Sequence, residues 1–142
     1  MNIRKASGPL ADRFNEVSAL RGQYGARPSS SRRRGLRNYL YVMQGGVCVR
    51  CGESMSWDGH ASNRAVCAHL VNACQTGPSG SDGKNWVAGN ITAQCESCNT
   101  SDRRANPSGD VTPDMLARPD LVVMEWPRGI ESDYSTTSGW VH

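Results

Sequence analysis

The residues of this chain that could do chemistry begin with two Cys-x-x-Cys pairs, Cys48–Cys51 and Cys95–Cys98. Two intervening residues let both sulfurs of a pair reach ~2.3 Å from one metal ion, and two pairs complete the tetrahedral thiolate set of a structural Zn²⁺ site. The gap between the pairs is far longer than the ~15–20 residues of a simple zinc ribbon. We therefore expect structural zinc at these four cysteines, with a further substructure inserted between the pairs.

A histidine and two asparagines, His69, Asn90 and Asn99, lie between the pairs or directly after them. The unperturbed pKa of histidine, ~6.5, lets an imidazole accept a proton from water near neutral pH. The amide oxygen of Asn99 is a ligand suited to a hard cation such as Mg²⁺. Each residue also has a purely structural interpretation: a packed strand histidine, a turn asparagine and a helix-start asparagine, respectively.

The segments around these residues predict the elements that must position them. Residues 65–71 form a continuous apolar run that favours a strand, and residues 90–93 predict a short returning strand. The intervening residues 72–89 are rich in Gly, Ser, Asn and Asp and predict a long loop. Residues 98–105 predict a helix. A metal would pin the start of this helix against the strands, so that Asn99 faces the end of the first strand.

Two further helices are predicted before the first cysteine pair. Residues 9–24 and 32–44 each carry apolar side chains at intervals of three and four, the spacing of one helical face. Residues 26–31 predict a linker, and Gly45-Gly46 ends the second helix. The side chains that we expect to pack are Leu10, Phe14, Val17, Leu20 and Tyr24 in the first helix and Leu36, Tyr39, Leu40 and Met43 in the second.

The C-terminal part carries weaker patterns. Thr112-Pro113-Asp114 is typical of a helix start. Residues 121–126 are apolar and bounded by prolines, so they either pack back as a strand or lie extended, and residues 128–142 are expected to fray. We divide the chain into a basic helical arm with its linker, a zinc-stapled core and a partly irregular C-terminal extension, at residues 1–31, 32–107 and 108–142.

The composition sets the size of the core and the compartment. Of 142 residues, 37% are hydrophobic and one is Phe, so the core is small and needs a staple such as structural zinc. Six cysteines without an apolar leader segment favour metal over disulfides and a reducing, cytoplasmic compartment. A disulfide-held secreted protein is the minor alternative. No stretch approaches the ~20 apolar residues of a membrane span, so no membrane partner is expected.

The charge distribution favours a nucleic-acid partner. The net charge is +3, but residues 1–50 hold ten basic residues against two acidic ones, whereas residues 51–142 carry a net charge of −5. Such an asymmetry is typical of a basic arm that binds nucleic acid, and a solvated arm is the alternative. Arginine grips phosphate bidentately. The expected DNA-binding residues are Arg32, Arg33, Arg34, Arg37, Arg103 and Arg104.

Residues 36–105 resemble the HNH endonucleases, especially small phage and bacterial members with a four-cysteine zinc site. The matching residues are Cys48-x-x-Cys51, His69, Gly89-Asn90-Ile91, Cys95-x-x-Cys98-Asn99 and the Gly45-Gly46 that precedes the first pair. The resemblance implies an α+β fold: a small zinc-stapled ββα-metal core, treble-clef-like, with a helical N-terminal extension. Residues 32–107 would be this nuclease core.

The resemblance also implies an activity and roles for three residues. The chain would be a metal-dependent DNA endonuclease that hydrolyses phosphodiester bonds, by nicking or by double-strand cleavage. His69 would be the general base, and Asn99 would ligate a single catalytic divalent ion such as Mg²⁺. Asn90 would orient the loop or the His69 ring by hydrogen bonds.

One residue departs from the family pattern. The position before the histidine, usually Asp, is Ala68 here and offers no side-chain ligand. A substitute oxygen would come from Asp58, Asn72 or Asp102, and a softer ion such as Mn²⁺ or Ni²⁺ would be an alternative to Mg²⁺. The departure keeps a second hypothesis open, a non-catalytic zinc-stapled DNA-binding module.

The remaining signals concern two cysteines and the source of the chain. Cys67 and Cys74 would form a second metal site with His60 or His69, or Cys67 is a small buried hydrophobe. Arginines outnumber lysines by fourteen to two, a bias that is associated with GC-rich genomes. Together with the small size and the Arg-rich arm of the chain, this bias favours a bacteriophage source. Phage packaging proteins would then be partners beside DNA, in the host cytoplasm. Sequence specificity and oligomeric state stay open.

Overall fold

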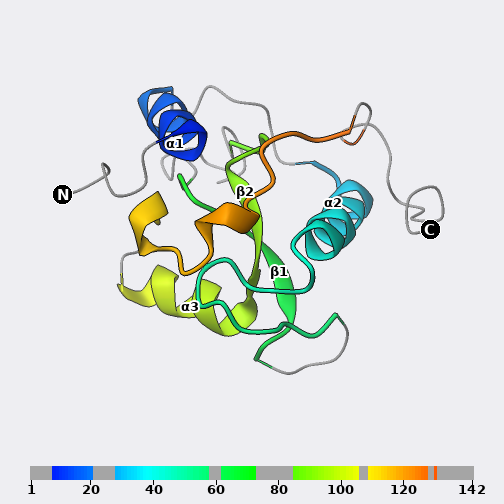
Figure 1. Cartoon of the computed structure of the whole chain (residues 1–142). Coiled ribbons are helices and arrows are strands. Elements are labelled where there is room, and N and C mark those ends of the chain that lie inside the picture. Colours follow the sequence, from blue (N-terminus) through cyan, green and yellow to red (C-terminus); the bar gives the residue numbers. More distant parts are fainter. Residues whose placement is uncertain are drawn as a thin grey trace.

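The fold combines helices with an antiparallel pair of strands, an α+β arrangement, in a computed structural model of the whole chain (Figure 1). The structure describes residues 8–20, 28–57, 62–72, 85–105, 109–127 and 130. The elements in chain order are α1 (Pro9–Ala19), α2 (Ser30–Met43), β1 (Ala65–His69), β2 (Ile91–Cys95), α3 (Glu96–Ala105) and two short 3-10 helices, η2 (Pro113–Met115) and η3 (Pro119–Leu121).

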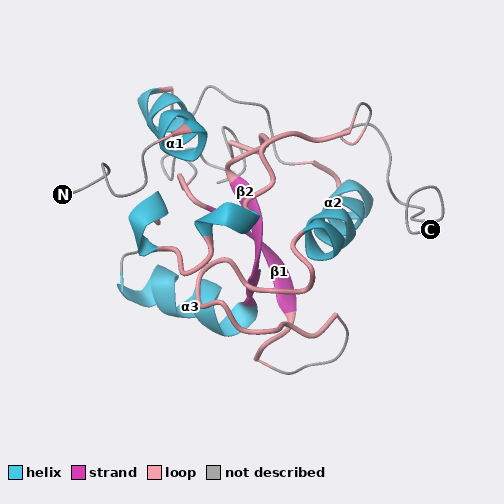
Figure 2. Ribbon diagram, in the orientation of Figure 1, coloured by secondary structure: helices cyan, strands magenta, loops and turns pink. Residues whose placement is uncertain are grey.

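The hairpin formed by β1 and β2 organises the molecule. Its register pairs Ala65 with Cys95 at one end and His69 with Ile91 at the other. At about 3.3 Å per residue, the two ends are separated by about 13 Å of strand. Helix α3 follows β2 without a linking residue, and α2 and α3 lie on different sides of the hairpin (Figure 2). The expected order of strand, strand and helix is therefore present.

Helix α2 begins two residues earlier than predicted. The Ser29 side chain accepts a hydrogen bond from the Arg32 backbone N–H at 3.3 Å and so caps the first turn. Gly45 and Gly46, with φ of 65° and 73°, end the helix as predicted, and the Gly46 N–H bonds back to the Tyr41 carbonyl. The helix boundaries thus follow from local capping chemistry.

The residues that α2 buries differ from the prediction at its last turn. Leu36 and Leu40 are buried as expected, but Met43 is 54% exposed and Gln44 is buried instead. The Gln44 amide donates hydrogen bonds to the Val47 and Ala93 carbonyls and accepts one from the Ala93 N–H, all at 2.9 Å. Backbone groups that need partners, rather than apolar area, therefore decide which side chain turns inward.

Helix α1 is shorter than the predicted 9–24 and ends at Ala19. Phe14 and Val17 are buried against Leu70 and Val71, the two residues that follow β1, whereas Leu20 is 40% exposed. Tyr24 and Gly25, which were expected to complete the helix and end it, lie outside the described residues.

The segment after α3 is packed into the fold rather than appended to it. Backbone N–H groups of Val111, Ala117 and Arg118 bond to the carbonyls of Leu70, Arg50 and Val49, and Gly89 donates to Val123. The predicted helix start at Thr112 gives only the single turn of η2, because Leu116 already returns to extended backbone. Val122 to Pro127 form neither a helix nor a strand, so the expected strand is absent there. The tail predicted to fray, 128–142, is described only at Ile130, which is buried.

Candidate functional site

The four paired cysteines converge at the junction of β2 and α3. Their sulfurs all lie within 4.8 Å of one another, and the Sγ atoms of Cys51 and Cys95 are 3.9 Å apart. Tetrahedral coordination at a Zn–S distance of about 2.3 Å requires sulfurs about 3.8 Å apart. The geometry fits one four-coordinate ion, so the cluster could hold a metal such as zinc.

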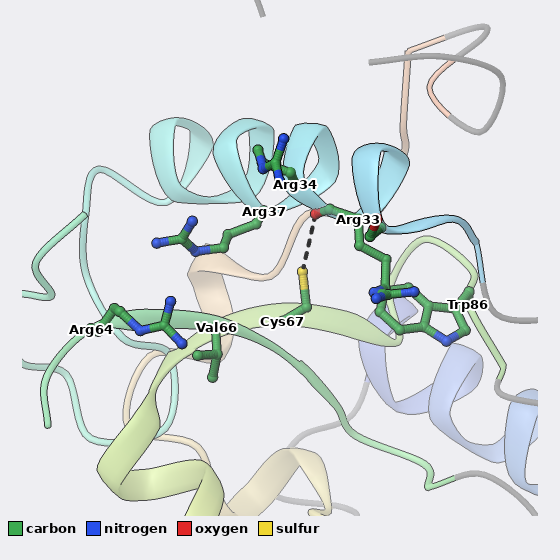
Figure 3. A pocket seen from close by; sticks show the side chains of 8 residues that line it. Arg33, Arg34, Arg37, Arg64, Val66, Cys67 and Trp86 are labelled. Carbon is green, nitrogen blue, oxygen red and sulfur yellow. Dashed lines mark hydrogen bonds between the residues drawn. The ribbon is translucent and has the colours of Figure 1, made fainter. Parts of the chain in front are cut away.

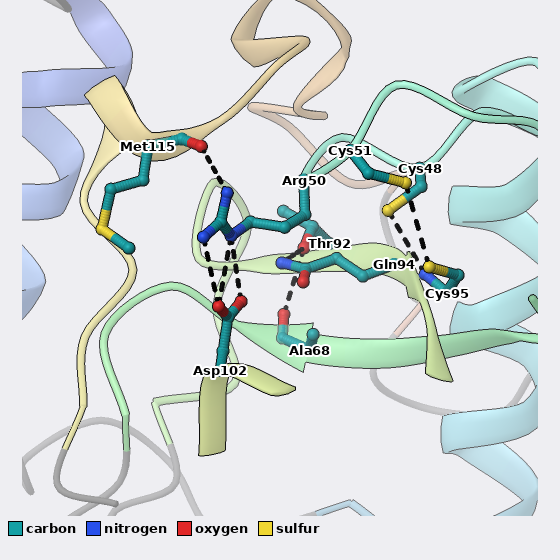
Figure 4. A network of polar contacts seen from close by, with 9 residues as sticks. All are labelled: Cys48, Arg50, Cys51, Ala68, Thr92, Gln94, Cys95, Asp102 and Met115. Carbon is teal, nitrogen blue, oxygen red and sulfur yellow. Dashed lines mark hydrogen bonds and ion pairs between the residues drawn. The ribbon is translucent and has the colours of Figure 1, made fainter. Parts of the chain in front are cut away.

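Each cysteine pair is positioned by its own short element. An isolated bridge between Val47 and Ser54 closes the first knuckle, in which the Cys48 N–H donates to the Glu53 carbonyl at 2.9 Å. Gly52 turns the chain there with φ of 81°, a conformation that favours glycine. In the second pair, Cys95 is the last residue of β2 and Cys98 lies in the first turn of α3. The Cys95 N–H donates to the Cys48 sulfur at 3.3 Å and joins the two pairs (Figure 4).

The thiols titrate differently within the cluster. Burial raises the pKa of Cys98, and the neighbouring sulfurs of Cys95, Cys48 and Cys51 raise it further. Burial also raises the pKa of Cys51. Burial acts in the same direction on Cys48, but backbone N–H groups, led by that of Cys95, outweigh it and lower the pKa. A divalent cation removes the mutual repulsion of such thiolates and deprotonates its ligands, so the donor set is suited to a metal.

The structure places His69 at the end of β1, at the end of the hairpin where residues 70–90 connect the two strands. Side chains alternate along a strand, so His69 shares the face of β1 with Cys67, whose sulfur approaches the Arg33 carbonyl of α2. The His69 ring meets Trp86 edge-on, with ring centroids 5.0 Å apart. Asn99, partly buried, lies on α3 beside Cys98. His69 therefore lies on the α2 side of the hairpin, whereas Asn99 lies in the first turn of α3, which starts at the other end of the hairpin.

Asn90 is buried and holds the chain directly after His69. Its Oδ1 accepts the Val71 N–H at 2.7 Å, and its Nδ2 donates to the carbonyls of Val71 at 3.1 Å and Asn85 at 2.9 Å. The residue thereby ties the end of β1 to the segment that enters β2. An orienting task, expected for Asn90 from the resemblance, is compatible with this geometry.

The face of the hairpin toward α3 offers few ligands for a second cation. Ala68, Thr92 and Gln94 are buried there, and Thr92 Oγ1 donates to the Ala68 carbonyl at 3.3 Å (Figure 4). Both oxygens of Asp102 are engaged by Arg50, at 3.0 Å from Nε and 3.2 Å from Nη2. Arg50 also donates to the Met115 carbonyl at 2.7 Å. The carboxylate of Asp102, which was expected as a substitute ligand, is therefore already paired with the Arg50 guanidinium.

The other two substitute oxygens are placed differently. Asn72 lies beyond the end of β1, where its side chain donates to the Gly109 carbonyl at 3.2 Å and its backbone N–H donates to Asp110 at 3.1 Å. Asp58 lies outside the described residues. Of the three, only Asp102 belongs to α3.

Some of the expected DNA-binding arginines are exposed, whereas others donate hydrogen bonds to backbone carbonyls of the protein. Arg32 and Arg34 on α2 are exposed, as is Arg104 on α3. Arg37 instead lies over the Trp57 ring at 4.0 Å and donates to the Trp57 and Ala65 carbonyls. It thus joins α2 to β1. Arg33 donates to the Pro28 carbonyl at 2.6 Å, and the side chain of Arg103 lies outside the described residues.

Sequence reasoning missed a pocket between α2 and β1 that includes Arg64 and Trp86 together with three of these arginines (Figure 3). No local pattern relates Arg64 to α2, because they are brought together only by the tertiary fold. The dense run Arg32-Arg33-Arg34 was the available signal, and it pointed to an extended surface rather than to a cavity.

A second metal site at Cys67 finds no support among the described residues. The only group of three or more candidate ligands in them is the four-cysteine cluster. Burial raises the pKa of Cys67 to about 12. The side chain is only partly buried, packed against the cluster of α2 and the hairpin. Cys74 and His60 lie outside the described residues.

Comparisons of this chain with family models, curated proteins and solved structures give no match. Within the described residues, no helix has the length and apolar character needed to cross a membrane.

Proposed function

We propose that this chain is a metal-dependent DNA endonuclease of HNH type, with structural zinc at the four cysteines. One observation carries the proposal: an antiparallel hairpin runs directly into a helix, with the cysteines clustered at that junction and His69 at the opposite hairpin end. This order of elements supports the ββα arrangement that the sequence resemblance implies for residues 32–107.

The proposed hydrolysis assigns a task to each of three residues. The His69 imidazole takes a proton from the attacking water, Asn90 fixes the chain that follows His69, and Asn99 offers an amide oxygen to a divalent ion. Such an ion, when bound, polarises the phosphate and stabilises the leaving oxygen. The protein ligands for it are few, so water would complete its coordination, as Mg²⁺ commonly retains several waters.

The test is cleavage of supercoiled plasmid by the purified full chain with Mg²⁺, Mn²⁺ and Ni²⁺ in turn. We expect His69→Ala to lower the cleavage rate by about 10²-fold or more, because a positioned general base contributes ~10²–10⁴-fold. Asn15→Ala, an exposed change on α1, is the control and should cleave at the parent rate. Unchanged cleavage by a folded, metal-loaded His69→Ala protein would remove His69 from the mechanism.

A second candidate is a non-catalytic zinc-stapled DNA-binding module. It is favoured by Ala68, which supplies no ligand, and by the engagement of Asp102 with Arg50. This candidate predicts DNA binding that weakens steeply with salt, no cleavage with any of the three ions, and equal binding by His69→Ala. The plasmid assay together with a salt titration separates the two candidates.

A further inference from the structure

A pocket of about 490 Å³ lies between the N-terminal half of α2 and strand β1 (Figure 3). Its volume is within the ~300–1,000 Å³ typical of small-ligand sites. The side chains that define it are Arg33, Arg34 and Arg37 from α2, Arg64 at the start of β1, Cys67 and Trp86. Four arginines from two separate segments therefore line one concave space.

The pocket has a strong positive charge. No carboxylate is among its lining residues in the described part of the chain. The ion pair that Arg64 makes, with Glu96 at 3.7 Å, joins two side chains that are each more than a third exposed, and water screens such a contact. Cys67 adds no negative charge, because burial raises the pKa of its thiol to about 12. An anion of matching size is the natural occupant, and guanidinium groups match phosphate oxygens bidentately.

Trp86 gives the pocket a flat aromatic wall. Figure 3 shows its indole beside the Arg33 guanidinium, at one end of the space that the arginines surround. The indole also meets the His69 ring edge-on, at a centroid distance of 5.0 Å. Aromatic side chains of this kind bind nucleobases by stacking, with little preference for sequence. The pocket thus offers arginines that can bind a phosphate and an aromatic ring that can stack on a base.

We propose that this pocket binds one nucleotide of a DNA strand, with its phosphate among the arginines and its base against Trp86. The assignment of DNA as the partner rests on the proposed function, whereas recognition of a nucleotide rests on the pocket alone. The Arg37 guanidinium donates hydrogen bonds to the carbonyls of Ala65 and Trp57. It thereby helps to shape the pocket and also contributes positive charge. Because Trp86 contacts His69, a nucleotide held here brings the strand to the His69 end of the hairpin.

The first experiment is calorimetric titration of the full chain with thymidine 5′-monophosphate, thymidine and the dinucleotide TpT without a terminal phosphate. We expect the monophosphate to bind at least tenfold more tightly than thymidine, because only the former presents an anion. Preference for the monophosphate over TpT assigns the pocket to a strand end, and equal affinity assigns it to an internal linkage. Equal binding of thymidine and its monophosphate would overturn the proposal.

Two exposed arginines on the same helix supply a matched pair of variants. Arg34 lines the pocket and Arg32 does not, so Arg34→Gln should weaken monophosphate binding by about tenfold and Arg32→Gln by less than about twofold. Equal losses would mean that charge acts diffusely and that no pocket is involved.

Trp86→Leu tests the base partner separately. It should weaken binding of the monophosphate while leaving binding of inorganic phosphate unchanged, and equal loss of both would contradict the stacking role. If this variant fails to fold by circular dichroism, the comparison of Arg34 with Arg32 decides.

The outcomes separate the pocket from the endonuclease. Monophosphate binding that depends on Arg34 without any plasmid cleavage supports the pocket and removes the enzyme. Plasmid cleavage without measurable monophosphate binding removes the pocket and leaves the enzyme.

Discussion

At the scale of single residues, two buried amides satisfy backbone groups that an apolar core would leave without partners. Gln44 and Asn90 are each 1% exposed, and each makes three hydrogen bonds to backbone groups of other segments. A buried backbone group without a partner is costly, so these side chains specify which segments meet. Asn90 matters most for the site, because its contacts fix the chain after His69.

Replacing Asn90 should destabilise the protein strongly. We expect Asn90→Ala to lower the free energy of unfolding by about 2–4 kcal/mol, because it leaves buried groups of Val71 and Asn85 without their partner. Asn15→Ala on the exposed face of α1 is the matched control and should change it by less than about 0.5 kcal/mol. Urea unfolding measures both, and similar values for the two variants would contradict the role of Asn90.

At the scale of elements, the turn into β2 is tightly packed at Gly89. Gly89 is buried, has φ of 85° and donates its N–H to Val123 at 3.0 Å. A Cβ at this position would lie 2.9 Å from Arg13 Cγ and 3.3 Å from Met124 Cε. Helix α1, the hairpin and the C-terminal segment therefore meet at one glycine.

Gly89→Ala should cost more than the same change at Gly45. Both glycines have positive φ, but nothing lies within 4 Å of a Cβ built at Gly45. We expect Gly45→Ala to lose about 1–2 kcal/mol for its backbone conformation, and Gly89→Ala about 1–3 kcal/mol more for overpacking. Thermal unfolding of the two variants gives the difference. Equal losses would show that Arg13 and Met124 move aside without cost.

At the scale of the whole molecule, the first cysteine knuckle joins the two apolar clusters. Cys48 packs in the cluster of α2 and the hairpin with Leu40 and Ile91, whereas Val49, the next residue, packs in the cluster of α1 with Phe14. A metal that fixes Cys48 therefore fixes both clusters. Because the apolar content of the chain is small, a metal bound at the four cysteines would add substantially to its stability.

Removing the metal should unfold the chain, and the cysteines should differ in their effect. We expect about one equivalent of zinc on the purified protein, loss of helical circular dichroism with a chelator, and recovery when zinc returns. Cys51→Ser should lose the zinc, whereas Cys67→Ser, outside the cluster, should retain it. Because zinc binds thiolates, its apparent affinity should fall as the pH falls. Metal-free protein with native helicity would contradict the stabilising role of the metal. Zinc retained by Cys51→Ser would contradict the assignment of Cys51 as a ligand.

The sequence alone determined the features that depend on short spacing. The paired cysteines, the double glycine after α2, the strand around Ala65–His69 and the helix that includes residues 98–105 follow from two-residue gaps, capping preferences and apolar runs. Each of these features depends on a few residues that are neighbours in the sequence. The HNH resemblance and its assignment of His69, Asn90 and Asn99 also came from such spacing and stand as the proposal above.

Only the tertiary structure decided which distant groups meet. It turned Gln44 inward in place of Met43, paired Asp102 with Arg50, and set Arg64 across from the arginines of α2. The first outcome depends on buried backbone groups that need partners and the second on opposite charges, whereas Arg64 is placed by the packing of β1 against α2. Their partners are selected by packing, which brings together residues whose separation in sequence carries no signal.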